Sequence, residues 1–185
     1  MRYPDFRELH TQRLRLRKIC MEDLELFYHR LGGSETVTRY MLFRPHRDME
    51  ESAASISKWL TRYASGPCYH WAIALKETDE LIGVIDLLRL DEETESGSFA
   101  YMLGESFWGQ GYGTEALRAV FDFAFREMEL ASIEADHMAE NTASGAVMRK
   151  LGMVCRGTVP GKYEKNGKWH DAVQYGIRRE QWLKE

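Results

Sequence analysis

The sequence predicts an α+β fold built around one mixed β-sheet. Short apolar runs with strand-like composition alternate with amphipathic helical segments along the chain. A short polar segment, residues 77–80, joins two of the apolar runs, and such a connection predicts an antiparallel hairpin. In the middle of the chain a strand, a glycine-rich loop, a helix and a further strand follow one another, and this order predicts two parallel strands.

The first half of the chain is expected to supply one strand and two helices before the hairpin. Leucines alternate with arginines over residues 13–17, a period typical of a strand with one buried face. Residues 21–31 form the first predicted helix, which ends at a pair of glycines. The second helix begins at Asp48, because Asp48 and Glu51 have the spacing of a capping box, and it ends at the Gly-Pro pair 66–67.

The second half contains the strongest helix and a terminal hairpin. Over residues 114–128 apolar side chains recur with the period of one helix face. Asn166 and Gly167 form the strongest signal for a two-residue hairpin turn. The predicted strands are 69–76, 81–90, 98–103, 132–137 and two that flank the Asn-Gly turn, with a short helix at about 142–150. The expected order is therefore β-α-α-β-β-β-α-β-α-β-β.

Composition and charge restrict the class of protein. The chain has 185 residues, 44% hydrophobic and 29% charged, which suits a single globular domain covering 1–185 and excludes disorder. A net charge of -4 argues against a nucleic-acid partner held by phosphate contacts. No apolar run approaches the roughly 18 residues of a membrane span, and the charged N-terminus is unlike a signal peptide. We therefore expect a cytoplasmic protein that binds neither nucleic acid nor membrane.

The cysteines and histidines do not indicate a metal centre. The three cysteines lie far apart and form no CxxC pair, which is typical of reduced thiols. The six histidines show neither HxH nor HxxxH spacing. The expectation is no metal and no disulfide.

A glycine-rich segment at residues 104–114, between a strand and the strongest helix, carries the main functional signal. The first turn of a helix has unpaired N–H groups and the positive end of the helix dipole, so it suits a phosphate. Glycine lets the backbone approach an anion closely and adopt a positive φ without steric cost. A flexible turn without a ligand is the simpler alternative.

Two familiar phosphate-binding motifs match this segment less well. A P-loop needs a lysine before its Ser/Thr, and the pair Gly113-Thr114 lacks one. A dinucleotide fingerprint is closer, because Gly111, Gly113 and Ala116 fit G-x-G-x-x-A and Glu134 follows about 20 residues later. However, several residues separate the preceding strand from the first glycine. The chain after Glu134 is also too short for the rest of a doubly wound sheet.

The same segment resembles the acetyl-CoA pyrophosphate loop of the GNAT N-acetyltransferases, and a tryptophan at its start is typical of the RimJ/RimL-like branch. Its residues are Trp108-Gly109-Gln110-Gly111-Tyr112-Gly113-Thr114-Glu115-Ala116-Leu117. Further landmarks of that branch are matched in order by residues 11–17, by Asn141–Ser144 with 150–153, by the 166–171 hairpin and by Trp182. The resemblance covers about residues 11–183. It implies a GNAT-like central mixed sheet with helices on both faces, an antiparallel meander and a β-loop-α-β unit that binds acetyl-CoA.

The resemblance also implies which residues bind the cofactor. The backbone of Tyr101, Met102 and Leu103 would pair with the pantetheine arm, and Asn141 and Ser144 would lie beside the pantetheine and the sulfur. The pyrophosphate would be held by backbone N–H groups of Gly109, Gln110, Gly111, Tyr112, Gly113 and Thr114. Asn141 is also a good helix N-cap, and Ser144 is equally compatible with a solvated helix position.

The catalytic groups are less clearly indicated. The amide of Leu103 is expected to donate to the thioester carbonyl. Many relatives carry a proton-donating tyrosine where this chain has Met148, so Ser144 is the candidate that hydrogen-bonds the leaving thiolate. For the base, Glu134 and Asp136 share one face of their strand, and a water relay or a purely solvated role for both remains open.

The expected function is transfer of acetyl from acetyl-CoA, used as co-substrate, to a primary amine in a ternary complex. The acceptor is a protein N-terminus, an amino acid, a polyamine or a drug-like amine, and residues 20–67 with the loop between the last strands are expected to wall its pocket. The alternative is an acyl-CoA-binding module without turnover. The sequence leaves the acceptor open, and also the choice between monomer and homodimer.

Overall fold

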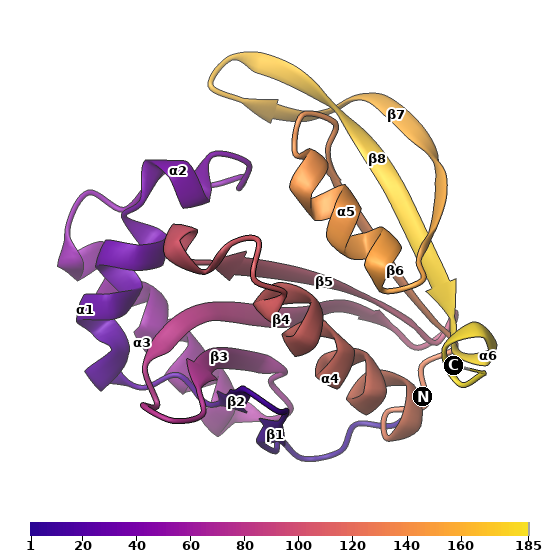
Figure 1. Ribbon diagram of the computed structural model, residues 1–185, viewed down its shortest axis with the longest axis horizontal. Helices are drawn as coiled ribbons and strands as arrows, with labels where there is room; N and C mark the ends of the chain where they lie inside the picture. The colour runs from indigo at the N-terminus through magenta and orange to yellow at the C-terminus, as the bar shows by residue number, and fades with distance from the viewer. Residues whose placement is uncertain (185) are drawn as a thin grey trace.

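The computed structural model describes residues 1–184, and its centre is one eight-stranded sheet (Figure 1). The strand order is β1-β2-β3-β4-β5-β6-β8-β7, and every neighbouring pair is antiparallel except β5 with β6. The strands are β1 Leu9–His10, β2 Leu14–Arg17, β3 His70–Leu75, β4 Leu81–Asp91, β5 Ser96–Leu103, β6 Ser132–Met138, β7 Val154–Lys165 and β8 Lys168–Arg178. The predicted mixed sheet, with one parallel pair around the glycine-rich loop and helix, is confirmed.

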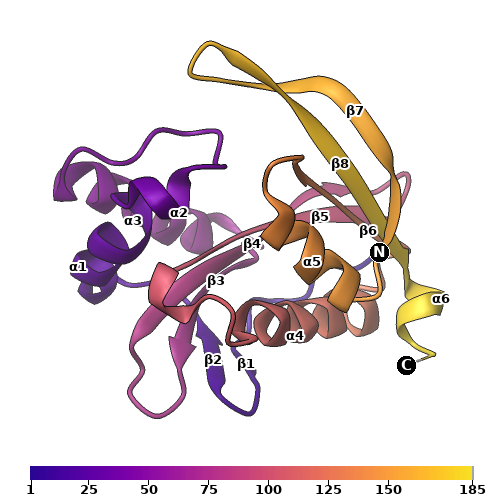
Figure 2. The same cartoon turned by 45° about the horizontal axis from the view of Figure 1, so that its top comes forward.

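Helices cover both faces of the sheet (Figure 2). One face carries α1 Leu24–Phe27, α2 Glu35–Thr38 and α3 Met49–Ser65, with a 3-10 turn Met21–Asp23 before α1 and a π-helical turn Tyr28–Gly32 after it. The other face carries α4 Tyr112–Arg126 and α5 Thr142–Lys150, and a 3-10 turn Glu105–Phe107 precedes α4. The short α6 Arg179–Trp182 follows β8.

Side-chain alternation along the strands produces two hydrophobic cores, one on each face. On β3, Ala72 packs with α1 and α3, whereas its neighbour Ile73 packs with α4. The α4 side is the larger core, in which Phe121 and Phe125 pack against Trp182 of α6. The sheet is thus buried on both faces where the helices cover it.

The parallel pair β5–β6 opens along its length, and this opening positions the candidate site. Within residues 1–184, β5 pairs with β6 at Ser96, Gly97 and Ser98 and no further, although β5 continues to Leu103. Beyond Ser98 the strands diverge, so the β6-facing edge of β5 lacks a strand partner. Antiparallel pairing with β4 continues as far as Leu103 on the opposite edge.

The first predicted helix is present, but it is not a regular α-helix. Residues 21–31 form a 3-10 turn, one α-turn and a π-turn in place of a single helix. Asp23 accepts from the Cys20 amide and pairs with the buried Arg17 at 2.8 Å, which sets the tight first turn. At the other end the Gly33 amide bonds the Tyr28 carbonyl five residues back, closing the π-turn.

The second helix and the terminal hairpin follow the sequence signals more closely. Asp48 caps α3 by accepting from the Glu51 amide, as predicted, whereas the Glu51 carboxylate binds Arg44 and Arg47 and does not complete a capping box. Asn166 and Gly167 both have positive φ, 53° and 75°, as a type I′ turn requires. The tip of the β7–β8 hairpin projects beyond the other strands of the sheet (Figure 1).

Candidate active site

The glycine-rich loop ends at the first turn of α4 and exposes backbone there. Gly109 and Gly111 have φ of 73° and 84°, a left-handed conformation that side chains rarely adopt, and Gly111 is the N-cap of α4. Gly113 differs, because it lies inside the helix with ordinary φ. A Cβ there would lie 3.5 Å from the Tyr101 ring, so the missing side chain keeps this wall open.

The opening strand braces this loop. Glu115, in the first turn of α4, accepts from the Thr11 hydroxyl at 2.6 Å and from the backbone and guanidinium of Arg13 at 2.9 and 2.7 Å. Burial alone would raise the pKa of Glu115, but these hydrogen bonds outweigh it and lower the pKa. Arg13 also donates to the Gln110 carbonyl at 3.1 Å and lies over the Tyr112 ring at 4.1 Å. The loop is therefore held from below by a fixed ion pair.

The end of β5 presents alternating backbone groups to the opening in the sheet. The Gly104 amide donates to the Ile82 carbonyl at 2.8 Å, and bonding residues alternate along an antiparallel strand. Met102 is therefore turned toward β4, and the backbone of Tyr101 and Leu103 faces the opening. The indole N–H of Trp108 donates to the Leu103 carbonyl at 2.6 Å, which leaves the Leu103 amide as the group presented at this end.

Helix α5 supplies polar side chains across the opening. Asn141 caps the helix by accepting from the Ser144 amide at 3.3 Å, and its side-chain NH2 group donates to the Ser144 hydroxyl at 3.0 Å. The capping role considered for Asn141 is thus present. Burial raises the pKa of Tyr101, whose phenol is close enough to Ser144 for that hydroxyl to oppose the rise. Met148 is buried in the core.

These groups line one cavity of about 240 Å³. Ten of the eleven residues predicted to bind the cofactor line it. They are Tyr101, Met102, Leu103, Gly109, Gly111, Tyr112, Gly113, Thr114, Asn141 and Ser144. Gln110 does not line it, because its side chain turns back to the Ser106 carbonyl at 2.7 Å. Met102 contributes its side chain, since its backbone faces β4. Lys150, which the sequence analysis did not single out, adds a cation.

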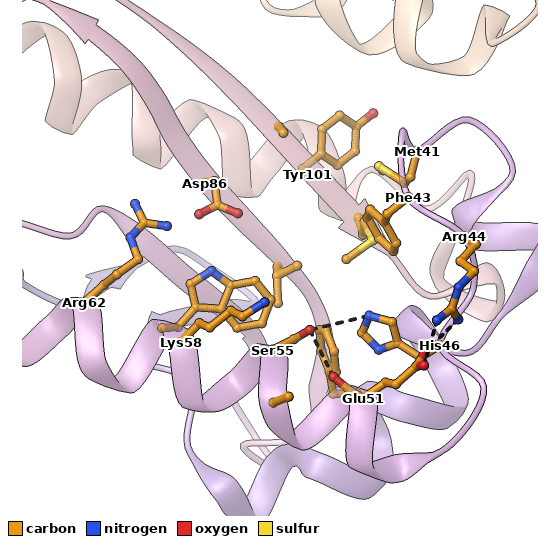
Figure 3. Close-up of a pocket in the computed structure, with 16 residues that line it drawn as sticks. Met41, Phe43, Arg44, His46, Glu51, Ser55, Lys58, Arg62, Asp86 and Tyr101 are labelled. Atoms are coloured by element: carbon orange, nitrogen blue, oxygen red, sulfur yellow. Dashed lines mark hydrogen bonds and ion pairs between the residues drawn. The ribbon is translucent and has the colours of Figure 1, made fainter. Parts of the chain in front are cut away.

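A larger cavity of about 650 Å³ lies on the other face, between α3 and strands β4 and β5 (Figure 3). Its walls are largely apolar, and Asp86 and Tyr101 lie on the sheet side. Asp86 is 19% exposed, and one of its oxygens lies 2.9 Å from Nδ1 of the buried His70. The geometry of that contact is not that of a hydrogen bond, and both ring nitrogens of His70 lack a hydrogen-bond partner among the described residues. His70 stacks on Trp59 at 3.9 Å.

The two carboxylates of β6 that were predicted as candidate general bases line a third cavity, of about 560 Å³, beneath the β7–β8 hairpin. Glu134 is 55% exposed and pairs with Arg156 at 2.9 Å. Asp136 is 16% exposed, accepts from the Tyr163 phenol and pairs with Lys162. Both carboxylates face away from the α4 core, as the strand pattern predicted.

Residues 38–43 and the hairpin tip close over the point where the three cavities meet. Met41 lines all three, and Tyr101 and Met102 line both the cofactor cavity and the α3 cavity. Lys165, at the hairpin tip, donates to the carbonyls of Thr38 at 2.8 Å, Met41, and Phe43 at 3.4 Å. Burial among these carbonyls lowers the pKa of Lys165.

Sequence reasoning missed two side chains of this site. Asp86 is the single acid in the apolar run of β4, and that interruption was the available signal. Tyr101 was predicted only for its backbone, and the nearness of its phenol to Ser144 depends on how β5 and α5 pack. Neither contact follows from spacing along the chain.

Comparisons with known proteins agree with this geometry. A family model described as the acetyltransferase (GNAT) domain matches residues 13–154. The chain is 29% identical to a protein named uncharacterized N-acetyltransferase p20 from Bacillus licheniformis, over 94% of this chain and 97% of that protein. It is 31% identical to FsC-acetyl coenzyme A-N(2)-transacetylase of Aspergillus fumigatus, over 95% of this chain and 78% of that protein.

Solved structures show the same fold. A GNAT-family acetyltransferase from Bacillus anthracis superposes with a TM-score of 0.84 at 24% identity, over 94% of this chain and 99% of that one. Ribosomal-protein-S5-alanine acetyltransferase from Vibrio fischeri superposes with a TM-score of 0.78 at 18% identity, over 96% and 99%. Both likenesses show that the fold is shared.

The structure thus combines a parallel strand pair that diverges with a glycine-rich helix start beside the opening. With the family match over residues 13–154, the chain belongs to the GNAT acetyltransferase family, whose members use acetyl-CoA. Residues 1–184 contain no group of three or more His, Cys, Asp or Glu placed to hold a metal ion. Across the described part of the chain, no helix is both long and apolar enough to cross a membrane.

Proposed function

We propose that this chain, as one N-acetyltransferase domain spanning 1–185, transfers acetyl from acetyl-CoA directly to a primary amine in the cytoplasm. The observation that carries the proposal is the divergence of β5 from β6 after Ser98, which leaves the Leu103 amide facing the opening between the strands. The cofactor cavity and the α3 cavity share Tyr101 and Met102 beside this opening. Cofactor and acceptor can therefore approach each other from opposite faces of the sheet.

The cofactor would bind mainly through backbone. Gly109, Gly111 and Gly113 let N–H groups at the start of α4 approach the pyrophosphate, where the dipole of a 15-residue helix favours negative charge. The pantetheine arm would continue along the free edge of β5, bonding the backbone of Tyr101 and Leu103. The residues present fit the group, because the cavity combines helix-start amides with the cation Lys150.

The chemistry then needs two protons to be handled. The amine nitrogen attacks the thioester carbon, a C–N bond forms, and the Leu103 amide stabilises the oxygen of the tetrahedral intermediate. The C–S bond then breaks, and the thiolate takes a hydrogen bond from Ser144, with the Tyr101 phenol beside it. A base takes one proton from the ammonium group before attack, and the second proton lost by the attacking nitrogen neutralises the thiolate. The products are the N-acetylated amine and free coenzyme A.

Asp136 is the better placed of the two predicted bases. Glu134 is more than half exposed and held by Arg156, whereas Asp136 lies deeper in a cavity that includes Met41. Asp136 contacts the Lys162 ammonium group and accepts from the Tyr163 phenol, so its carboxylate is held within this cavity. Asp86 is the competing base, because it lines the larger cavity. Asp136→Asn, Glu134→Gln and Asp86→Asn should be compared by the pH profile of kcat/KM, and the base is the residue whose loss removes the acidic limb.

The test of the proposed function is a panel of peptide N-termini, amino acids, polyamines and drug-like amines. Thiol release from acetyl-CoA and the mass of each product are measured. We expect acetylation on nitrogen for at least one class. Tight acetyl-CoA binding with no turnover on any amine would instead support the non-catalytic acyl-CoA-binding module.

A further inference from the structure

The α3 cavity carries an unequal set of charges. Glu51 binds Arg44 through two hydrogen bonds of 2.7 and 2.8 Å and binds Arg47 at 2.6 Å. The negative charge of Glu51 is therefore balanced by these two arginines. These hydrogen bonds hold the pKa of Glu51 far below its usual range. Burial lowers the pKa of His46, which favours its neutral form.

Two cations of α3 remain without a counter-charge. Lys58 and Arg62 are one helical turn apart, both line the cavity, and neither has an ion-pair partner within residues 1–184 (Figure 3). Like charges at this spacing repel each other and weaken a helix. A bound anion between them would remove that repulsion, so their pairing on the cavity wall points to a ligand with negative charge.

The wall between these cations and the sheet is apolar and rigid. It is formed by aromatic and aliphatic side chains, which include Phe27, Phe43, Trp59, Val84 and Met102. Trp59 is fixed between Phe27, at a ring distance of 5.5 Å, and His70, at 3.9 Å. A ligand that spans the cavity therefore needs an apolar body.

Asp86 offers the opposite charge on the sheet side of the cavity, where the strands β4 and β5 lie (Figure 3). Before it loses its proton, the ammonium group of an acceptor would be attracted to this carboxylate. The cavity thus presents one negative group beside the strand that borders the cofactor and two positive groups on the helix across from it.

We propose that the acceptor is a small amine with an apolar body and an anionic group, as in an aromatic α-amino acid, and that Lys58 and Arg62 bind the anion. This inference rests on the proposed function and names its substrate class. A polyamine would bring several positive charges next to two unpaired cations. A simple neutral-bodied amine would leave both cations without a partner.

The closing experiment compares phenylalanine with two analogues that lack the negative charge. Phenethylamine has a more basic amine than phenylalanine, and phenylalaninamide has a less basic one, so the pair brackets the effect of amine basicity. We expect kcat/KM for phenylalanine to exceed both by about tenfold or more, and spermidine to be poorer still. The phosphonate analogue of phenylalanine then tells whether carboxylate or phosphate-type anions are preferred.

Variants assign the effect to the cavity. Lys58→Gln with Arg62→Gln should remove most of the preference for phenylalanine over phenethylamine, measured as the ratio of the two kcat/KM values. Arg126→Gln is the control, at an exposed position on α4 outside these cavities. It removes one positive charge, as each of the two substitutions does, and should leave the preference for phenylalanine intact.

Other outcomes separate the two proposals. Better turnover of phenethylamine, phenylalaninamide, spermidine or a peptide N-terminus than of phenylalanine would overturn this inference and leave the N-acetyltransferase proposal standing. An unchanged preference in the double variant would also overturn it. Failure to acetylate any amine while acetyl-CoA still binds would overturn both.

Discussion

The two halves of the candidate site differ in the groups that form them: backbone groups form one half and side chains form the other. On the α4 and α5 side, the loop after β5 presents backbone N–H groups, and glycines keep side chains out of the way. On the α3 side, the cavity is shaped and charged by side chains from several separate elements, such as Trp59 on α3 and Asp86 on β4. Under the proposed function, the backbone-built half would recognise a group common to all coenzyme A substrates, whereas the side-chain-built half would be free to vary with the acceptor.

This difference predicts where substitutions act. Changes that move backbone at the start of α4 should weaken coenzyme A binding whatever the acceptor. Changes on the α3 side or at the hairpin tip should alter acceptor kinetics and leave coenzyme A affinity intact. A substitution on the α3 side that changes coenzyme A affinity, or one at the start of α4 that changes only acceptor kinetics, would show that the two halves are not independent.

The largest effect is expected at Gly113. The two branches of a valine would press on Tyr101 and displace the first turn of α4, which removes charge-assisted hydrogen bonds to the pyrophosphate. Gly113→Val should raise the Kd for coenzyme A roughly a hundredfold, about 2.7 kcal/mol. Gly113→Ala is the matched control, because a Cβ would make only ordinary contact with Tyr101 at 3.5 Å. Equal calorimetric affinity of the valine variant and the wild type would refute the assignment.

Ser144 should affect turnover without affecting affinity. Loss of one hydrogen bond to the departing thiolate costs roughly 1.5–3 kcal/mol, so Ser144→Ala should lower kcat about ten- to a hundredfold. Tyr101→Phe is measured beside it, because the phenol lies near the same hydroxyl. Steady-state rates at saturating acetyl-CoA decide the matter, and a kcat equal to that of the wild type would mean that solvent protonates the thiolate.

Lys165 should influence only the acceptor half. Its ammonium group joins the hairpin tip to the carbonyls of Thr38 and Phe43, above the meeting point of the cavities. Lys165→Met keeps the length of the side chain and removes these bonds, so KM for the amine should rise about fivefold, roughly 1 kcal/mol. Lys168→Met, on the other side of the same turn, is the control. A changed Kd for coenzyme A in Lys165→Met would contradict the separation of the halves.

The smallest effect concerns pH and the wall of the α3 cavity. Burial lowers the pKa of His46, and its ring bonds Ser52 at 2.8 Å and packs against Phe27 and Phe43. A lowered pKa in the folded state means that this stabilisation is complete above the ordinary value of about 6.5 and is lost as the pH falls through the folded value.

His46→Gln should therefore show a smaller loss of stability on acidification than the wild type. The free energy of unfolding is measured by denaturant titration at about pH 7.5 and about pH 5, on either side of the ordinary histidine range. Glu51 and Arg44, the charged neighbours of His46, stay paired over this interval, so the difference between the proteins isolates the histidine. Parallel pH dependence in both proteins would exclude His46 as the source.

The sequence predicted the fold, and it predicted most of the residues that line the cavity beside α4, because both depend on local signals. The spacing of the glycines, the period of α4 and the Asn166-Gly167 turn are each satisfied by their own neighbours in the chain. Residues 21–31 are helical as predicted, but their division into 3-10, α and π turns was not foreseen, because it accompanies contacts such as the buried pair of Arg17 and Asp23. The short β1, α2 and α6 were missed for a similar reason, since elements this small are stabilised by the surfaces on which they pack.

The acceptor half could not be predicted to the same depth. Residues 20–67 were expected to wall the acceptor pocket, and α3 with residues 41–46 lines the α3 cavity, but the charges in that cavity depend on pairing across the fold. Glu51 binds Arg44 and Arg47, and the cavity-lining cations Lys58 and Arg62 have no ion-pair partner among residues 1–184. Which charged side chains pair with one another depends on their positions in the fold, and the spacing of residues along the chain does not reveal it.

The central claim is that the cofactor binds the free edge of β5 through backbone. Residue-resolved amide hydrogen exchange with and without acetyl-CoA tests it most directly. Addition of acetyl-CoA should slow exchange at Tyr101 and Leu103, whose amides face the opening, and at the first amides of α4. The Met102 amide, already turned toward β4, should change little. Equal protection of all three β5 amides, or none at Leu103, would contradict the account.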